Sequence, residues 1–202
     1  MRVAVLASGE GTNLQALLDK VHGREGIELV AVASDKPEAR ALERARAAGV
    51  ETGVFSLSGD GDRAERDRAM ASWLRSLDAE LVVLAGYMQL LSDEFLDTFP
   101  GRIINVHPAL LPAFPGLQAV EQAIDYGVKV FGVTVHFVDQ GIDTGPVILQ
   151  RAVELPDAGS AEEVLEWLHP IEHELLPEVV RLIGRGAVRI DPEHPRRVIV
   201  ER

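Results

Sequence analysis

Short apolar runs alternate with segments of helical spacing through the first half of the chain. The apolar runs are Val3 to Ala7, Ile27 to Ala33, Thr52 to Phe55, Leu81 to Ala85 and Arg102 to Val106. Between them, apolar residues recur with the period of an amphipathic helix over Leu14 to Val21, Ala39 to Ala48 and Ala64 to Leu77. Continuous apolar runs are typical of strands that are buried on both faces. The alternation therefore predicts βαβ units and an open, mostly parallel sheet.

The pattern changes after residue 108. Val130 to Val138 and Val147 to Val153 have the composition of two further strands, and Ala161 to Ile183 carries a long helical stripe. Pro170 and Pro177 lie inside that stripe and should kink the helix.

The predicted fold is a single Rossmann-like α/β domain over residues 1–202. Its open twisted sheet is mostly parallel, with helices on both faces and an antiparallel strand in the C-terminal half. Ala187 to Ile190 and Val198 to Val200 predict a short hairpin within residues 186–202. With 202 residues and 47% hydrophobic content, the chain has enough apolar surface for one full core.

The net charge of the chain limits the classes of molecule that it can bind. Lys and Arg number 20 and Asp and Glu number 32, so the net charge is −12. Such a surface would repel nucleic acid and anionic lipid, and local donors would have to hold any anionic ligand. The absence of Cys excludes disulfides and thiolate chemistry. No apolar run approaches the ~20 residues of a membrane span, so we expect a cytoplasmic protein without membrane or nucleic-acid partners.

The first candidate site is the loop Ser8-Gly9-Glu10-Gly11-Thr12-Asn13, which follows the first strand and opens the first helix. Backbone N–H groups and the positive end of the helix dipole would face a ligand there, as in phosphate sites. The loop is not a dinucleotide fingerprint, because Leu14 stands where the third Gly should be, and it is not a P-loop. The alternative is a tight turn in which Thr12 or Asn13 caps the helix.

The second candidate site combines an amide, an imidazole and a carboxylate. Asn105 and His107 alternate at the end of an apolar strand, so both side chains face the same side, where parallel sheets form their ligand crevice. The proline-rich loop 108–116 follows directly, and Asp143 lies further along between two glycines. An amide can hold an oxyanion, an imidazole can carry a proton and a carboxylate can orient the imidazole and raise its pKa, which favours acyl transfer. The alternative is a structural histidine beside a turn-forming asparagine.

Two elements of this sequence resemble the folate-dependent formyltransferases. They are Asn-x-His-Pro-x-Leu-Leu-Pro from Asn105 and Gly-x-Thr-Val-His-x-Val-x-x-x-x-Asp-x-Gly-Pro from Gly132. The loop Ser8 to Leu14 resembles the branch of this family that formylates glycinamide ribonucleotide in purine (IMP) biosynthesis. The resemblance spans roughly residues 1–185. It implies a nucleotide-binding half over about 1–100 and a folate-binding, catalytic half over about 101–185.

The resemblance implies direct formyl transfer from the co-substrate 10-formyltetrahydrofolate to the amine of glycinamide ribonucleotide, through a tetrahedral intermediate. On the matching positions, Asn105 would stabilise the oxyanion, His107 would donate a proton and Asp143 would hold the imidazole. Neither a metal nor a covalent nucleophile is expected. The physical reading of the three side chains agrees with these roles.

Substrate contacts are also implied by the resemblance. Gly11, Thr12 and Asn13 would hold the ribonucleotide phosphate, and Glu172 would contact the glycinamide or ribose portion. The implied folate contacts are Arg63, Met88, Gln89, Leu90, Leu91 and Asn105. Gln89 departs from the family, because relatives often carry a basic residue there. For residues 85–91 the alternative is that the segment belongs to the core, because an apolar run that ends a central strand usually does.

Other interpretations stay open at this point. His169-Pro170-Ile171-Glu172-His173 fits a zinc-protease pattern, although Pro170 would distort the turn that has to align the ligands. A related formyltransferase with another acceptor, or a formyltetrahydrofolate hydrolase, would share the catalytic elements. The tRNA enzymes would be expected to carry a basic appended domain and the hydrolase an extra N-terminal domain. A non-catalytic nucleotide-binding module would leave Asn105, His107 and Asp143 unexplained. We expect a monomer or a homodimer.

Overall fold

The computed structural model describes residues 1–57 and 62–201. Within these residues, seven strands form one sheet and two form a separate pair. The order in the larger sheet is β3 (Glu51–Val54), β2 (Glu28–Ser34), β1 (Arg2–Leu6), β4 (Leu81–Leu84), β5 (Ile103–His107), β6 (Val130–Phe137) and β7 (Val147–Glu154), and the pair is β8 (Val188–Ile190) with β9 (Val198–Val200). The chain divides into two units, Met1–Ile104 and Asn105–Arg202, and the division falls within β5 (Ile103–His107).

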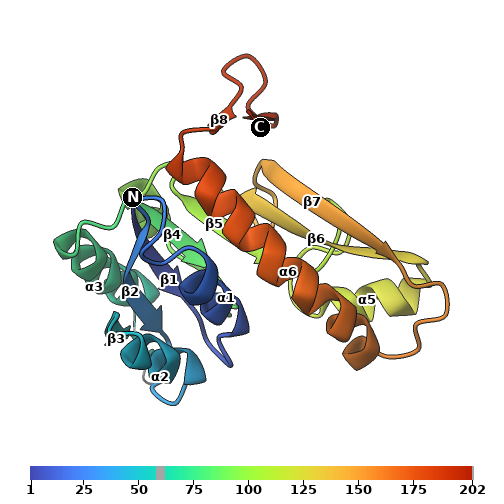
Figure 1. The fold of residues 1–202 in the computed structure, drawn as a ribbon, viewed down its shortest axis with the longest axis horizontal. Coiled ribbons are helices and arrows are strands. Elements are labelled where there is room, and N and C mark those ends of the chain that lie inside the picture. The colour runs from blue at the N-terminus through green and yellow to red at the C-terminus, as the bar shows by residue number, and fades with distance from the viewer. Residues whose placement is uncertain (58–61, 202) are drawn as a thin grey trace. The chain divides into compact units, whose positions relative to one another are not determined.

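The first unit is built from parallel strands joined by helices (Figure 1). Its elements are β1 (Arg2–Leu6), α1 (Thr12–Lys20), β2 (Glu28–Ser34), α2 (Arg40–Ala47), β3 (Glu51–Val54), α3 (Arg63–Ser76), β4 (Leu81–Leu84) and α4 (Asp93–Thr98). β1 pairs in parallel with both β2 and β4, and β2 pairs in parallel with β3. β1 is therefore a central strand, and Val3 to Leu6 have no exposed surface, whereas β3 is an edge strand without a buried residue.

The helices of the first unit form two groups. α1 contacts α2, and α3 contacts α4. The connections from β1 to β3 run in one direction across the sheet, and the connection from β3 to β4 returns past β1. Because crossovers between parallel strands are right-handed, this reversal places the two groups of helices on opposite faces. The carboxyl ends of β1 and β4 flank the point of reversal.

The second unit begins with the end of β5 and contains the antiparallel part of the structure (Figure 1). Its further elements are α5 (Ala119–Tyr126), β6 (Val130–Phe137), β7 (Val147–Glu154), α6 (Ala161–Gly184), β8 (Val188–Ile190) and β9 (Val198–Val200). β6 and β7 pair in an antiparallel ladder that shifts register between Val135 and His136. α6 packs against β6, β7 and α5 through its buried apolar stripe.

Local chemistry explains where α6 begins. The Ser160 hydroxyl accepts a hydrogen bond from the Glu163 N–H at 3.2 Å, and the Glu163 carboxylate accepts one from the Gly159 N–H at 3.0 Å. Reciprocal bonds of this kind satisfy donors that the first helical turn leaves free. Pro170 and Pro177 both lie inside this one continuous helix.

The predicted α/β class, with a mostly parallel sheet and an antiparallel strand in the C-terminal half, is confirmed. The predicted strands and long helices differ from the observed ones by one or two residues at their ends, and the terminal hairpin is present. The pattern analysis missed α4 and α5; the six residues of α4 are too few to display a helical period. The organisation of residues 1–202 as one domain stays a prediction.

Candidate active site

The end of β5 presents Asn105 and His107 on the same face. The two side chains are separated by Val106, which strand alternation turns to the opposite face. His107 is buried, with 5% of its surface exposed, and Asn105 is half-buried. The predicted placement of both residues at the carboxyl end of a strand is therefore observed.

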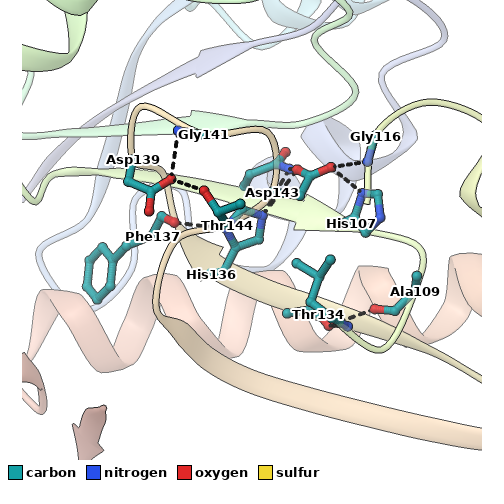
Figure 2. Close-up of polar contacts among 12 residues, drawn as sticks. His107, Ala109, Gly116, Thr134, His136, Phe137, Asp139, Gly141, Asp143 and Thr144 are labelled. Atoms are coloured by element: carbon teal, nitrogen blue, oxygen red, sulfur yellow. Dashed lines mark hydrogen bonds and ion pairs between the residues drawn. The ribbon is translucent and has the colours of Figure 1, made fainter. Parts of the chain in front are cut away.

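The carboxylate of Asp143 contacts the side chains of Asn105 and His107. Figure 2 shows Asp143 beside His107 and Gly116. Asp143 Oδ1 accepts a hydrogen bond from Asn105 Nδ2 at 3.1 Å, and its Oδ2 lies 3.3 Å from His107 Nδ1. Oδ2 also accepts a hydrogen bond from the Gly116 N–H at 2.8 Å. The three residues singled out from the sequence thus form one cluster within the second unit.

The loop that carries Asp143 is closed by its own polar contacts. Asp139 Oδ1 accepts hydrogen bonds from Thr144 Oγ1 at 2.6 Å and from the Gly141 N–H at 3.1 Å. A Cβ atom at Gly145 would lie 1.7 Å from the carbonyl oxygen of Phe137, so this close approach requires glycine. Asp143 itself has a φ of 52°, a strained conformation that the surrounding contacts hold.

The environment of Asp143 favours its charged form. Burial by itself would raise the pKa of Asp143, but the net effect is in the opposite direction. The contact with His136, the hydrogen bond from the Gly116 N–H and the positive charge of His107 lower the pKa of Asp143 below its ordinary value. Asp143 is therefore a carboxylate at neutral pH.

The ring of His107 lies between two acceptors. Its Nε2 lies 2.8 Å from the carbonyl oxygen of Phe114, and its Nδ1 faces the Asp143 carboxylate. A carbonyl and a carboxylate can only accept, so the imidazolium with a hydrogen on each nitrogen satisfies both contacts. This arrangement suits a side chain that donates a proton.

His136 is the member of the cluster that the sequence analysis did not single out. Its Nδ1 lies 2.8 Å from the carbonyl oxygen of Phe137, so Nδ1 carries a hydrogen. Its Nε2 lies 3.2 Å from Asn105 Nδ2 and 3.5 Å from Asp143 Oδ1. In the neutral ring, Nε2 accepts from the Asn105 amide and so fixes which end of that amide faces the cluster. The sequence feature that could have indicated this contact with Asn105 is the position of His136 near the end of a predicted strand, β6.

The predicted phosphate loop lies in the first unit. Gly11 precedes α1 with a φ of 71°, and no side chain caps this helix, so the alternative in which Thr12 or Asn13 is the cap is not observed. A Cβ atom at Gly11 would lie 2.7 Å from the Cα atom of Ala41, which explains the glycine. A helix start that follows a glycine at the capping position is of the kind that binds anions through backbone N–H groups.

The segment after β4 presents alternate side chains to opposite sides. Met88 and Leu90 are 57% and 56% exposed, and Leu91 is half-buried. Tyr87 is buried, and burial raises its pKa to about 12. Exposed neighbouring apolar side chains of this kind suit a flat aromatic ligand.

Gln89 points to other residues of the first unit. Its Nε2 donates to Asp35 Oδ2 at 3.1 Å, and its Oε1 accepts from Arg66 Nη1 at 3.4 Å. Arg66 forms a buried ion pair with Asp67 at 2.7 Å and also donates to the Leu90 carbonyl. The sequence analysis did not predict that Asp35, Arg66 and Asp67 form a polar group around Gln89, because no sequence pattern connects residues so far apart in the chain.

The other predicted contacts have different environments. Arg63 is exposed at the first position of α3. Glu172 is buried in α6, with 6% of its surface exposed. The rings of His169 and His173 stack at 6.2 Å between centroids.

Within residues 1–57 and 62–201, no group of three or more His, Cys, Asp or Glu is arranged to hold a metal ion. None of the helices in these ranges is long and apolar enough to cross a membrane.

Comparisons with known proteins show the family to which the chain belongs. The sequence profile of the family described as Formyl transferase matches residues 1–180. The phosphoribosylglycinamide formyltransferase of Bacillus subtilis (strain 168) is 41% identical over 185 residues, which are 91% of this chain and 95% of that protein. The trifunctional purine biosynthetic protein adenosine-3 of Bos taurus is 40% identical over 190 residues, 94% of this chain and 19% of that protein.

The fold of this chain matches that of a solved structure over the whole length of the chain. Glycinamide ribonucleotide transformylase 1 from Symbiobacterium toebii superimposes with a TM-score of 0.94 at 44% identity, covering 100% of this chain and 94% of that one. With this match to the fold and the profile match to residues 1–180, the chain belongs to the formyl transferase family.

Proposed function

We propose that this chain transfers the formyl group of 10-formyltetrahydrofolate to the amine of glycinamide ribonucleotide, giving formylglycinamide ribonucleotide and tetrahydrofolate in purine biosynthesis. The observation that carries the proposal is the Asp143 carboxylate, which contacts Asn105 Nδ2, His107 Nδ1 and the Gly116 N–H together. The names of the similar proteins agree with this substrate.

The proposed reaction begins when the amine nitrogen of the ribonucleotide attacks the formyl carbon. A carbon–nitrogen bond forms, and the formyl oxygen takes the negative charge of a tetrahedral intermediate. The Asn105 amide would donate to this oxygen. In the resting cluster that amide contacts Asp143 and His136, which hold its nitrogen in place, and one of these two contacts would be exchanged for the oxyanion.

The intermediate collapses when the bond from the formyl carbon to N10 of the folate breaks. N10 must gain a proton, and the amine nitrogen must lose one, which would pass to solvent water or to His107 after that ring has given up its own proton. His107 would supply the proton to N10, and the Asp143 carboxylate would stabilise the imidazolium that carries it. The low pKa of Asp143 supports this role, because the carboxylate keeps its charge at neutral pH.

The ligand contacts are proposed residue by residue. We assign the ribonucleotide phosphate to Gly11, Thr12 and Asn13, supported by the uncapped start of α1. Glu172 would contact the glycinamide or ribose portion. The proposed folate contacts are Met88, Leu90 and Leu91, supported by the exposure of Met88 and Leu90, together with Arg63, Gln89 and Asn105. The contacts of Gln89 with Asp35 and Arg66 favour a supporting role for that side chain.

The wider proposals follow from the same activity. Residues 1–202 would act as one formyltransferase domain, with 10-formyltetrahydrofolate as co-substrate and no metal in the reaction. The cytoplasmic location and the monomeric or homodimeric state stay predictions.

The test is a spectrophotometric assay of formyl transfer from 10-formyltetrahydrofolate, with and without glycinamide ribonucleotide. Turnover that requires the ribonucleotide is the expected result. Folate deformylation without the ribonucleotide would identify a hydrolase and contradict the proposal. Absence of folate chemistry in folded protein would also contradict it and would direct attention to other formyl acceptors.

A further inference from the structure

A single buried hydroxyl on β6 holds the beginning of loop 108–116. Thr134 has no exposed surface, and its Oγ1 donates to the carbonyl of Ala109 at 2.6 Å (Figure 2). The same oxygen accepts from the Leu111 N–H at 3.1 Å and from Gln150 Nε2 at 2.9 Å. A hydroxyl offers one hydrogen and two acceptor sites, so every hydrogen-bonding site of Thr134 is used.

Gln150 completes this arrangement from β7. It lies directly opposite Thr134 in the antiparallel ladder, and its Nε2 also donates to the carbonyl of Leu111 at 2.9 Å. Both hydrogens of the amide are therefore used, one on the hydroxyl and one on the loop. Thr134 and Gln150 together bind three polar backbone atoms of the loop, in residues 109 and 111.

A second contact with β6 lies two residues earlier. A Cβ atom at Gly132 would lie 2.5 Å from Leu110 Cδ2 and 2.4 Å from the Arg151 carbonyl oxygen. Leu110 therefore packs on bare backbone at Gly132. Since Gly132 and Thr134 share one face of β6, this face holds residues 109, 110 and 111 in succession.

The far end of the same loop contacts the candidate active site. The Phe114 carbonyl accepts from His107, and the Gly116 N–H donates to Asp143. Between the two ends, the Ala113 N–H donates to the Leu110 carbonyl at 3.1 Å and closes a turn. A shift at Leu111 therefore moves the partners of both His107 and Asp143.

We propose that Thr134 is a positioning residue for the formyl transfer proposed above. Its hydroxyl, supported by Gln150, holds loop 108–116 so that Phe114 and Gly116 orient the His107 ring and the Asp143 carboxylate. Thr134 acts through the backbone of the loop, and it sets the rate of the chemical step more than the affinity for either substrate.

The test compares four variants of the full chain. Thr134→Val keeps the side-chain shape and removes the hydroxyl, whereas Thr134→Ser keeps the hydroxyl. Gln150→Glu keeps the size and removes the N–H donors. Thr98→Val is the matched control, because the Thr98 hydroxyl also donates to a carbonyl, that of Glu94 at 2.7 Å, within α4 of the first unit.

The first readout is nuclear magnetic resonance of the histidine ring nitrogens in ¹⁵N-labelled protein, followed over pH, with His107 assigned by its loss in His107→Gln. The second is the division of the kinetic effect between kcat and KM. We expect Thr134→Val to shift the His107 signals and its titration curve, and to lower kcat by about 10- to 100-fold with KM little changed. Gln150→Glu should act in the same direction, while Thr134→Ser and Thr98→Val should resemble the wild type.

Either of two results would overturn the proposal. One is wild-type His107 signals in folded Thr134→Val, and the other is a serine variant as impaired as the valine variant. If the wild type transfers no formyl group, the proposed function fails, but the ring signals still decide whether Thr134 positions His107.

Discussion

At the scale of single residues, the candidate site depends on what surrounds Asp143. The carboxylate receives hydrogen bonds from the Asn105 amide and the Gly116 N–H, and it lies close to the rings of His107 and His136. The sequence predicted the meeting of Asn105, His107 and Asp143 through the family resemblance. It did not predict His136, because a histidine within a strand is usually a packed side chain.

His107→Ala should leave ligand binding intact and reduce turnover by about 10²- to 10⁴-fold, because the proton donor is lost. Substrate affinity can be measured by calorimetry and turnover by the formyl-transfer assay. His194→Ala is the control, since this side chain is 68% exposed and contacts Asp191 in the C-terminal hairpin. Unchanged turnover in His107→Ala would exclude the assigned role.

Asp143→Asn should change how stability depends on pH. The pKa of Asp143 is lowered in the folded state, so its charge stabilises the fold fully above the unfolded-state pKa of about 3.9. This contribution disappears as the pH falls through the lower folded-state pKa. The wild type should therefore lose more unfolding free energy than Asp143→Asn between pH 7 and pH 3 in urea titrations. Parallel losses in the two proteins would contradict the assignment.

At the scale of secondary-structure elements, β6 has the largest part in shaping the site. Three residues on one face of β6 contact neighbouring segments. Leu110 packs on Gly132, the Thr134 hydroxyl donates to the Ala109 carbonyl, and His136 contacts the Asn105 amide. Alternation along the strand is visible in the sequence. Which partner each position would meet is not, because the partners come from residues 105–111 of a different strand and loop.

Gly132→Ala should destabilise the protein by about 1–3 kcal/mol, because the new methyl group would overlap the Arg151 carbonyl and Leu110. The free energy of unfolding in urea measures this effect. Gly159→Ala is the matched control, since no heavy atom lies within 4 Å of a Cβ atom built there. The control should stay within about 0.5 kcal/mol of the wild type. Equal stability of the two variants would show that Leu110 does not need the bare backbone at Gly132.

At the scale of the whole molecule, the net charge of −12 opposes the approach of anionic ligands. Both proposed substrates carry negative charge, so their capture depends on local donors such as the N–H groups at the start of α1. The sequence alone predicted this division between the overall field and the local site.

Raising the ionic strength from about 10 to 150 mM should therefore increase kcat/KM for the ribonucleotide by a few-fold, because salt screens long-range repulsion. Initial rates at low substrate concentration, with folate saturating, measure this ratio. As a control for stability, the thermal unfolding temperature should be measured at each salt concentration, at neutral pH and without denaturant. A steep fall of kcat/KM with salt would instead mean that a positive local field steers the substrate.

The sequence by itself determined the fold class, because apolar runs of strand length and helical periodicity are properties of consecutive residues. It also determined the chemical types in the active-site cluster, since Asn105, His107 and Asp143 lie in recognisable elements. The tertiary structure decided the rest: the place of His136 beside the Asn105 amide, the bonds of Gln89 with Asp35 and Arg66, and the attachment of loop 108–116 to Thr134. These contacts join residues from 23 to 54 positions apart, and only the pairing and packing of whole elements brings such residues together.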